Sequence, residues 1–384
     1  MSLTVTEAQP IARFRDEFPI FRHSIYLNSC SLGALSARSR KRVVEFLDLW
    51  ETRGASAWYD VWLAKLDELR AGYARVIGAP APSTIALHPS ISSALTAVGE
   101  SLDYSARRRI VTTDLDFPTV AYQWLAKAGE GVEVVVVESP DATTIPLEAM
   151  ARAINDRTAL VATSHVFFTS GAIQDIRALS TIAHAHDALL LVDGYQAAGQ
   201  LPVDVIELDV DFYCAGGLKW LLGGPGIAFL YTRPSLSARL VPRAPGWFAH
   251  ADPFRFDPAT LTLRDDGRRL ESGTPALAAV YAQLGGLDLI EELGIGAIRR
   301  ATMELTEDLI TGAREAGLRP KVAETSGERS AIVMVPRADP RADVRRLAER
   351  SIVTDFRPGH VRISPYFYNV ADDHRAALEC LREY

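Results

Sequence analysis

The chain has 384 residues, of which 48% are hydrophobic and 23% charged, as in a globular enzyme that can bury a large core. Its 41 lysines and arginines against 48 aspartates and glutamates give a net charge of −7, which excludes the bulk positive charge typical of nucleic-acid-binding proteins. No stretch approaches the roughly 18 uninterrupted apolar residues of a membrane span. Met1–Pro10 lacks the basic start and apolar core of a signal peptide. Three scattered cysteines predict neither a disulfide framework nor a metal site, so we expect a protein of the reducing cytoplasm.

The first clear element is a helix that Ser36 caps and that runs toward Arg53, with Gly54 as its stop. Beyond about residue 60, helical patterns alternate with short apolar runs rich in β-branched residues. These runs cover 109–113, 132–137, 159–163, 188–192 and 227–231. Because they are continuously apolar, they predict strands buried on both faces, in a mainly parallel sheet covered by helices. A helical pattern over 175–185 predicts a crossover between two of these strands.

The pattern changes after about residue 258. Long helical stretches over 275–292 and 297–316 precede sparse strands at 331–335 and 360–364. This predicts a smaller α+β domain packed on the large α/β domain. We expect three parts: an N-terminal segment (1–32) that packs with the small domain, a large domain (33–257) and a small C-terminal domain (258–384).

Two residues of the large domain carry the chemistry. Asp193 ends an apolar run, and Lys219 lies on a short loop before the next one. Ligands of parallel α/β sheets bind beyond the carboxyl ends of the strands. A lysine that forms a Schiff base and a carboxylate that keeps a pyridine nitrogen protonated are what pyridoxal 5′-phosphate (PLP) chemistry requires. The sequence therefore predicts a PLP site, with Gln196 either placed to reach the phenolic oxygen of the cofactor or exposed as a loop amide.

Other segments supply candidates for holding the cofactor. Ser90, Ile91 and Ser92 begin a helix, where backbone N–H groups and hydroxyls form a phosphate cradle, although helix capping alone also explains the serines. Phe117 follows a strand and can stack on a pyridine ring or fill the core below the loop. His165 closes the next strand, where a cofactor contact, proton transfer and a purely structural role are all open.

Together these segments resemble the class V aminotransferase family of PLP-dependent fold type I enzymes, over nearly the whole chain. The centre of the resemblance is VDGYQAAG (192–199), VDFY (210–213) and GLKWLLGGPG (217–226). Several further segments resemble the kynureninase-like, cysteine lyase-like branch: YLNSCSLG (26–33), DFPT (116–119), HVFFTSG (165–171), GWFAH (246–250) and SGTP (272–275). The resemblance implies a large PLP-binding domain with a mainly parallel mixed sheet between helices, and a smaller α+β domain.

Site residues follow from the resemblance position by position. It makes Lys219 the Schiff-base lysine and Asp193 the partner of the pyridinium, with Phe117 stacked on the ring. It also implies that Trp247 and Thr274 approach the phosphate, with Thr274 reaching across from the second subunit of a homodimer.

The substrate side follows in the same way. Arg362 matches the arginine that binds the α-carboxylate, a task that suits the planar guanidinium fork. Asn28 and Cys30 belong to the opening segment beside the substrate. For the substrate side chain, the candidate pocket residues are Cys30, Tyr59, Trp247, Phe248 and Tyr366, although core or dimer packing explains the aromatic ones equally well.

Departures from the kynureninase pattern argue against kynurenine itself as the substrate. Val120, Gln196, Leu218 and Cys30 stand where kynureninases have aspartate, histidine, tyrosine and asparagine. No cysteine lies where persulfide-forming desulfurases carry their nucleophile. We expect an enzyme that forms an external aldimine and quinonoid with a small α-amino acid. The reaction that we expect first among the alternatives is that of a β-lyase. An aminotransferase, an epimerase and a non-catalytic PLP-fold protein remain as alternatives.

Overall fold

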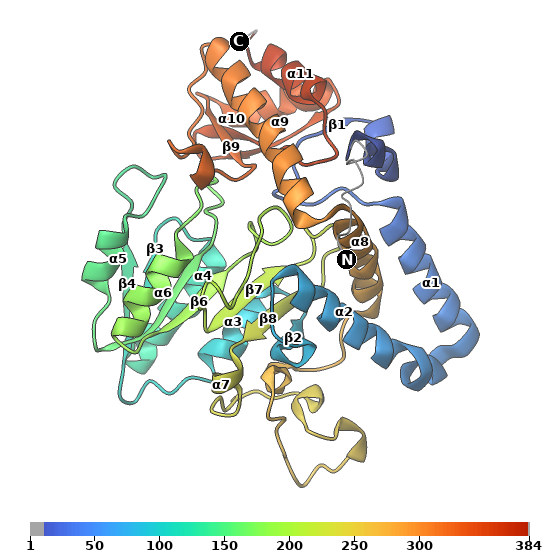
Figure 1. Ribbon diagram of the computed structural model, residues 1–384, viewed down its shortest axis with the longest axis vertical. Coiled ribbons are helices and arrows are strands. Elements are labelled where there is room, and N and C mark those ends of the chain that lie inside the picture. The colour runs from blue at the N-terminus through green and yellow to red at the C-terminus, as the bar shows by residue number, and fades with distance from the viewer. Residues whose placement is uncertain (1–10, 383–384) are drawn as a thin grey trace, which may run out of the picture.

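The computed structural model describes residues 11–382, so the expectation for Met1–Pro10 lies outside the described residues. Figure 1 shows a large part built around one sheet and a smaller part above it, formed mainly by the C-terminal end of the chain. Within residues 11–382, no helix is long and apolar enough to cross a membrane.

The large part is built on a seven-stranded sheet in the order β2-β8-β7-β6-β5-β3-β4. Strand β8 runs antiparallel to its neighbours β2 and β7, and the remaining pairs are parallel. This confirms the predicted mainly parallel α/β fold. The strands are β2 (Ile85–His88), β3 (Arg109–Thr113), β4 (Glu133–Val137), β5 (Thr158–Ser164), β6 (Leu189–Asp193), β7 (Phe212–Gly216) and β8 (Ala228–Thr232).

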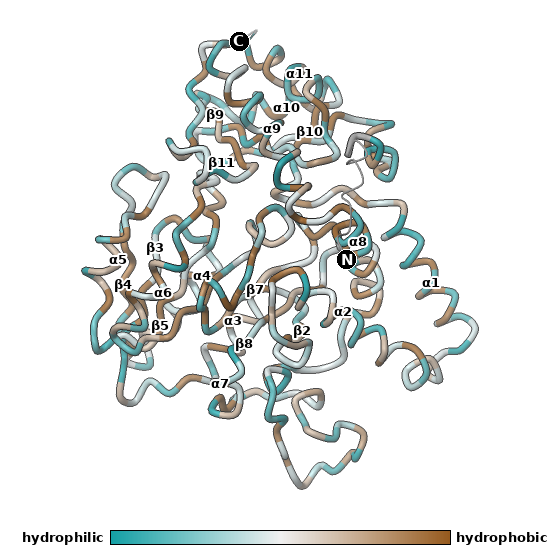
Figure 2. The backbone as a smooth tube through the Cα atoms, viewed as in Figure 1, coloured by the Kyte–Doolittle hydropathy of each residue, from teal (hydrophilic) through white to brown (hydrophobic). Residues whose placement is uncertain are grey.

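Helices cover both faces of this sheet. Alternate strand residues enter two different hydrophobic clusters, one under α3 and α4 and the other under α2, α5, α6 and α8. Figure 2 shows the matching brown colour along the central strands and teal on the outer loops. The helices are α1 (Ala37–Arg53), α2 (Leu63–Val76), α3 (Ile91–Gly99), α4 (Pro118–Leu125), α5 (Leu147–Ala153), α6 (Ile176–Ala185), α7 (Pro234–Ser237) and α8 (Leu277–Leu293).

Helix α1 begins and ends as its sequence indicates. The Ser36 side chain accepts a hydrogen bond from the Ser39 N–H, and Gly54 ends the helix with a φ of 51°. One side of α1 packs on α8. Part of its apolar side chains remains exposed in the protomer: Val44, Leu47 and Trp50.

The small part contains an antiparallel three-stranded sheet in the order β11-β12-β9 and a parallel pair β1-β10, which joins the N-terminal segment to it. Its elements are β1 (Ile25–Tyr26), α9 (Ile295–Glu315), β9 (Val333–Pro336), α10 (Pro340–Glu349), β10 (Ile352–Val353), β11 (Asp355–Arg357), β12 (His360–Ile363) and α11 (Ala371–Arg382). Helix α8 lies beyond residue 258 but packs on α1 and α2. The domain boundaries at residues 33 and 258 stay predictions.

Candidate active site

A cavity of about 490 Å³ lies where the carboxyl ends of the parallel strands face the small domain. This is the edge at which α/β sheets bind ligands, and the volume falls within the range of small-molecule sites. The cavity brings together most residues that the sequence singled out: Cys30, Ser90, Ile91, Ser92, Phe117, Asp193, Gln196, Lys219 and Arg362.

Lys219 follows the end of β7, and its Nζ lies between two aromatic rings. The centroid of the Tyr195 ring is 4.1 Å from Nζ, and that of Phe117 is 5.9 Å away. Burial lowers the pKa of Lys219 to about 8, although the negative charge of Asp193 opposes that shift. A large fraction of the amine is therefore neutral near pH 8, which is the form that attacks an aldehyde.

Asp193 ends β6 with its carboxylate in the cavity wall. Its Oδ1 accepts a hydrogen bond of 2.8 Å from the Tyr195 backbone N–H. Burial raises the pKa of Asp193 to about 6, while the Tyr195 N–H and Lys219 act against this rise. The carboxylate is thus charged at neutral pH but poorly compensated, and a protonated pyridine nitrogen would supply the missing positive charge.

The N-terminus of α3 forms the other end of the cavity. Ser90 caps the helix by accepting a hydrogen bond from the Ser93 N–H at 3.2 Å. Ser92 Oγ lies 2.7 Å from Thr119 Oγ1, and both side chains line the cavity. Hydroxyls and first-turn N–H groups at a helix N-terminus form an anion-binding arrangement, which fits the phosphate of PLP.

Gln196 is fixed at both ends of its amide. Its Nε2 donates to the Cys30 carbonyl at 3.0 Å, and its Oε1 accepts from Trp220 Nε1 at 2.7 Å. The amide orientation is thereby set, and the second Nε2 hydrogen remains for a ligand in the cavity. The same contact holds the opening segment, with Cys30, against the large domain.

Arg362 is 1% exposed and reaches the cavity from β12. Its Nη2 donates to Ser31 Oγ at 2.5 Å and to Asp355 Oδ2 at 3.0 Å, and its Nη1 donates to the Phe168 carbonyl at 3.3 Å. These contacts fix the guanidinium at the wall opposite the sheet, where a carboxylate ligand can meet it.

The structure does not bring His165 to this cavity. Its neighbours Ser164 and Val166 line the wall, whereas the imidazole turns inward, with Nδ1 3.1 Å from Tyr213 Oη. Burial lowers the pKa of His165 to about 4, so the ring stays neutral at physiological pH. Of the alternatives open for this residue, the geometry favours a structural role.

Several other predicted residues also lie away from the cavity in the protomer. Trp247 lines a separate hollow together with Phe256, and Thr274 is exposed. Asn28 pairs with Ser364 in an isolated β-bridge. The remaining pocket candidates are likewise elsewhere: Tyr59 is exposed, Phe248 is buried, and Tyr366 donates its hydroxyl hydrogen to a backbone carbonyl.

Sequence reasoning missed several cavity residues: Ser31, Thr119, Tyr195 and Arg357. Tyr195 stands between Asp193 and Gln196, and its ring packs against Gly216, where a Cβ would come within 2.3 Å of it. For Arg357, the signal was the alternation Asp355-Phe-Arg357, which puts two charged side chains on one face of a short strand.

A comparison with protein families identifies the family to which the chain belongs. Residues 41–376 match the model of the family described as Aminotransferase class-V. The chain belongs to the class V aminotransferase family. It is therefore a PLP-dependent enzyme, and the residues of the cavity fit that cofactor at the amine, the carboxylate and the helix N-terminus.

Relatives extend over nearly the whole class V chain. The uncharacterized aminotransferase YcbU of Bacillus subtilis is 34% identical over 367 residues, covering 96% of each protein. The kynureninase of Deinococcus radiodurans is 30% identical, covering 96% of this chain and 92% of its own.

Solved structures with the same fold include a cysteine desulfurase from Thermococcus onnurineus NA1, with a TM-score of 0.86 and 24% identity over 100% of this chain and 98% of its own. A mutant of C-DES, with glycine covalently linked to its PLP, has a TM-score of 0.89 and 22% identity, covering 96% of this chain and 99% of its own. At these identities the likeness shows the fold.

Proposed function

We propose that the class V chain acts on a small α-amino acid as a β-lyase that cleaves a C–S or Cβ–Cγ bond. PLP, when bound, supplies an electron sink for the negative charge that develops at the substrate Cα. The observation that carries the proposal is the pair of Lys219, with its lowered pKa, and Asp193, facing one cavity at the ends of neighbouring strands.

In this proposal Lys219 binds the cofactor aldehyde and, once released, moves the proton at the substrate Cα. Asp193 holds the pyridine nitrogen protonated, and Phe117 covers the ring. The first turn of α3 holds the phosphate through Ser90, Ile91 and Ser92, and Gln196 donates to the phenolic oxygen. Arg362 binds the substrate carboxylate from the opposite wall.

The lyase outcome rests on similarity to kynureninases, which extends over almost the full length of both proteins. Transamination is the second candidate, because YcbU is 34% identical and is described as an aminotransferase. The two outcomes differ in stoichiometry. A β-lyase releases its product without a second substrate, whereas an aminotransferase stops after one turnover unless a keto acid is added.

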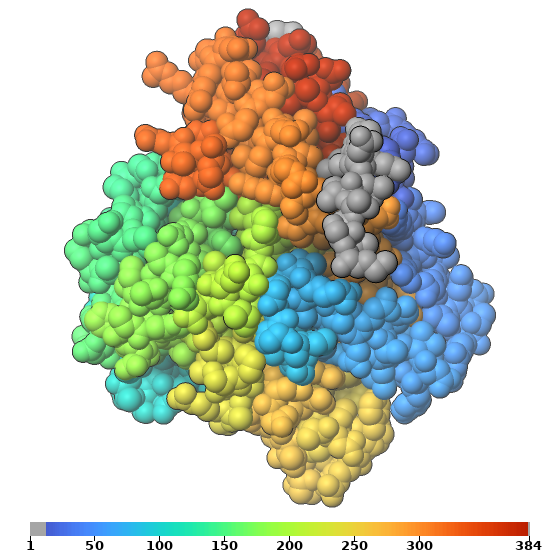
Figure 3. Space-filling model, viewed as in Figure 1, coloured from blue at the N-terminus to red at the C-terminus, as the bar shows by residue number. Residues whose placement is uncertain are grey.

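We also propose a homodimer in the cytoplasm. The exposed apolar residues of α1 and a projecting aromatic loop with Trp247, Phe254 and Phe256 offer apolar surface for a second subunit. This loop is the golden projection at the bottom of Figure 3. Thr274 is exposed and would reach the partner's phosphate site. Sedimentation of the purified protein as a monomer at micromolar concentration would contradict the proposal.

The cofactor role is tested by absorbance. The purified protein with PLP should show a Schiff-base band, and Lys219→Ala should lose both the band and turnover. A protein that stays colourless after PLP addition would refute the proposed site. A band without turnover of any amino acid would instead favour the non-catalytic alternative. Accumulation of the amine form of the cofactor, with turnover dependent on a keto acid, would replace the lyase by an aminotransferase.

A further inference from the structure

The wall opposite Lys219 carries two arginines, although the family resemblance assigned a role to one. Arg362 on β12 and Arg357 on β11 both line the cavity. Asp355 pairs directly with Arg362 in the antiparallel register, and Arg357 follows Asp355 by two residues. All three side chains therefore lie on the same face of the small sheet.

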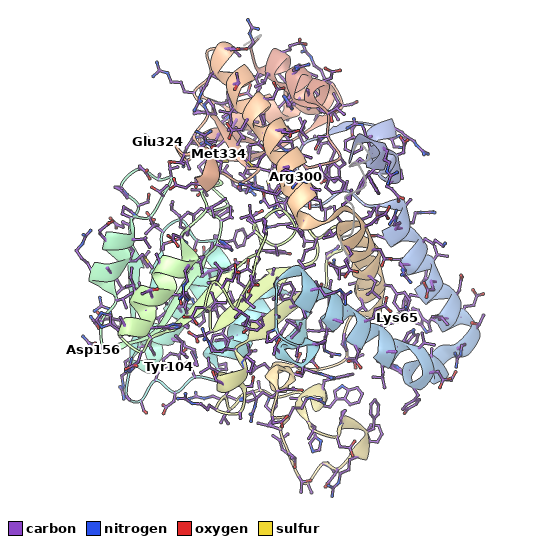
Figure 4. All side chains as sticks on the ribbon, in the orientation of Figure 1. Lys65, Tyr104, Asp156, Arg300, Glu324 and Met334 are labelled. Carbon is purple, nitrogen blue, oxygen red and sulfur yellow. The ribbon has the colours of Figure 1, made fainter. Side chains whose placement is uncertain are left out.

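That face is turned toward the large domain. On β9, Met334 pairs with Arg362 and packs in the main hydrophobic cluster of the large domain, whereas Val333 and Val335 pack inside the small domain. Met334 is labelled in Figure 4 and lies on β9, the strand that pairs with β12. The alternation along these strands thus directs the charged residues of β11 and β12 to the cavity.

The two arginines share one carboxylate oxygen. Asp355 Oδ2 accepts from Arg357 Nη1 at 2.8 Å and from Arg362 Nη2 at 3.0 Å. Ser31 Oγ donates to the same oxygen at 2.9 Å. The two guanidinium groups are therefore direct neighbours, with a single negative charge between them.

The remaining donors of the two arginines differ. Three hydrogen bonds, to Ser31, Asp355 and Phe168, hold Arg362 at 1% exposure. Arg357 uses only Nη1, toward Asp355 Oδ2 and the Phe356 carbonyl at 2.6 Å. Within residues 11–382, its Nε and Nη2 have no hydrogen-bond partner, so Arg357 presents an open, side-on fork to the cavity.

A bound substrate that covers this fork excludes solvent from it. A neutral, apolar side chain would leave its N–H groups without acceptors, which is unfavourable, whereas an anionic group matches the fork in charge and geometry. We propose that the substrate carries a second anionic group on a short side chain and that Arg357 binds it while Arg362 binds the α-carboxylate. The substrate class is then an acidic α-amino acid; this inference rests on the proposed PLP function.

Spectral titration of the PLP-loaded protein tests this directly, because bound amino acids perturb the cofactor band. L-Aspartate is compared with L-asparagine, and L-glutamate with L-glutamine, since each pair differs mainly in the charge of the side chain. We expect the wild type to bind at least one acid roughly tenfold or more tightly than its amide. Arg357→Gln should abolish that preference by weakening the acids alone.

Two further variants sharpen the test. Arg357→Lys keeps the charge but not the fork, and we expect it to restore only part of the preference. Arg375→Gln, on the exposed face of α11, changes the same charge away from the cavity and should leave both affinities unchanged. Equal binding of acids and amides, an equal loss for both in Arg357→Gln, or no change in that variant would each overturn the assignment.

Failure of this assignment is distinguishable from failure of the proposed function. A Schiff-base band that responds to amino acids without preferring acids refutes the acidic substrate class alone. A protein without that band, or one whose band no amino acid perturbs, refutes the proposed function instead.

Discussion

Two buried aspartates at the same edge of the sheet differ in the number of hydrogen bonds that their carboxylates accept. Asp116, beyond the end of β3, is 6% exposed, and Asp193, at the end of β6, is 5% exposed. Burial is the largest cause of a raised pKa for both carboxyls. Asp116 accepts five hydrogen bonds, from the N–H or hydroxyl groups of Thr112, Thr113, Thr163 and Ser164. Among the residues that the structure describes, Asp193 accepts one hydrogen bond, from the Tyr195 N–H.

The difference separates a structural carboxylate from a functional one. Asp116 joins the ends of β3 and β5, and its acceptor capacity is used within the protein. Asp193 keeps unsatisfied capacity in a cavity wall, which costs stability until a cationic partner binds there. A buried charge that its surroundings compensate only in part is typical of residues kept for function.

Among the tests of this comparison, we expect removal of the Asp116 carboxylate to have the largest effect on the free energy of unfolding. In Asp116→Ala, buried N–H and hydroxyl donors lose their acceptor, and we expect a loss of about 3–5 kcal/mol in the free energy of unfolding. Urea denaturation of the apoprotein measures it. Protein that remains folded at low temperature should still bind PLP. A stable variant that cannot bind PLP would reverse the roles of the two residues.

The counterpart is Asp193→Asn. Loss of the charge opposite the pyridine nitrogen should lower kcat by roughly 10²–10³, as for other preorganised electrostatic groups. The apoprotein should become more stable at pH 7 to 8, by on the order of 2 kcal/mol. The sign follows from the pKa of Asp193, which is about 6 in the folded protein, above the usual 3.8. Ionisation of Asp193 therefore disfavours the folded state. The stability is lost as pH rises from 3.8 to about 6, and the loss is complete at pH 7 to 8. Asp372→Asn, on exposed α11, is the matched control.

The two aspartates also show which parts of the fold and of the site could be predicted from the sequence. Of the strands in the large sheet, β3, β4, β5, β6 and β8 were predicted within one residue of their ends, because continuous β-branched runs have few other structures open to them, whereas β2 and β7 were not predicted. Asp193 was found because it ends such a run, and Lys219 because it lies on a short loop before the next one. Asp116 was seen only as part of a loop motif, since its five donors come from two strands that pair in space and are distant in sequence.

Other side chains needed the three-dimensional structure for a related reason. Arg357 enters the cavity only because β11 and β12 pair in a particular register, which short strands with mixed polarity do not specify. The inward turn of His165 depends on Tyr213 from a neighbouring part of the sheet. Trp247 and Thr274 lie outside the cavity, and the roles predicted for them depend on the proposed homodimer.

A smaller effect concerns the amine that faces Asp193. The folded apoprotein holds the pKa of Lys219 at about 8, below the usual 10.5, because burial disfavours the ammonium. The rate at which PLP reconstitutes the apoprotein should therefore rise with pH and level off above about 8. Stopped-flow absorbance at fixed ionic strength measures it. In Asp193→Asn the plateau should begin at a lower pH, because the opposing carboxylate charge is gone. A rate that keeps rising toward pH 10 would show an ordinary, unperturbed lysine.

The smallest effects separate structure from binding within one helix turn. Ser90→Ala removes the cap of α3 and should cost about 1 kcal/mol in unfolding free energy, besides any loss of the phosphate contact proposed for Ser90. Ser92 bonds to Thr119 inside the cavity, so Ser92→Ala should weaken PLP binding roughly tenfold with little change in apoprotein stability. Equilibrium dialysis and thermal unfolding of both variants give the comparison. If Ser92→Ala destabilises the apoprotein as much as Ser90→Ala does, the hydroxyl near Thr119 belongs to the fold. If PLP affinity falls in Ser92→Ala while its stability is unchanged, the Ser92 hydroxyl serves cofactor binding, whereas the Ser90 hydroxyl caps the helix. Asp193 and Asp116 differ in the same way at the edge of the sheet.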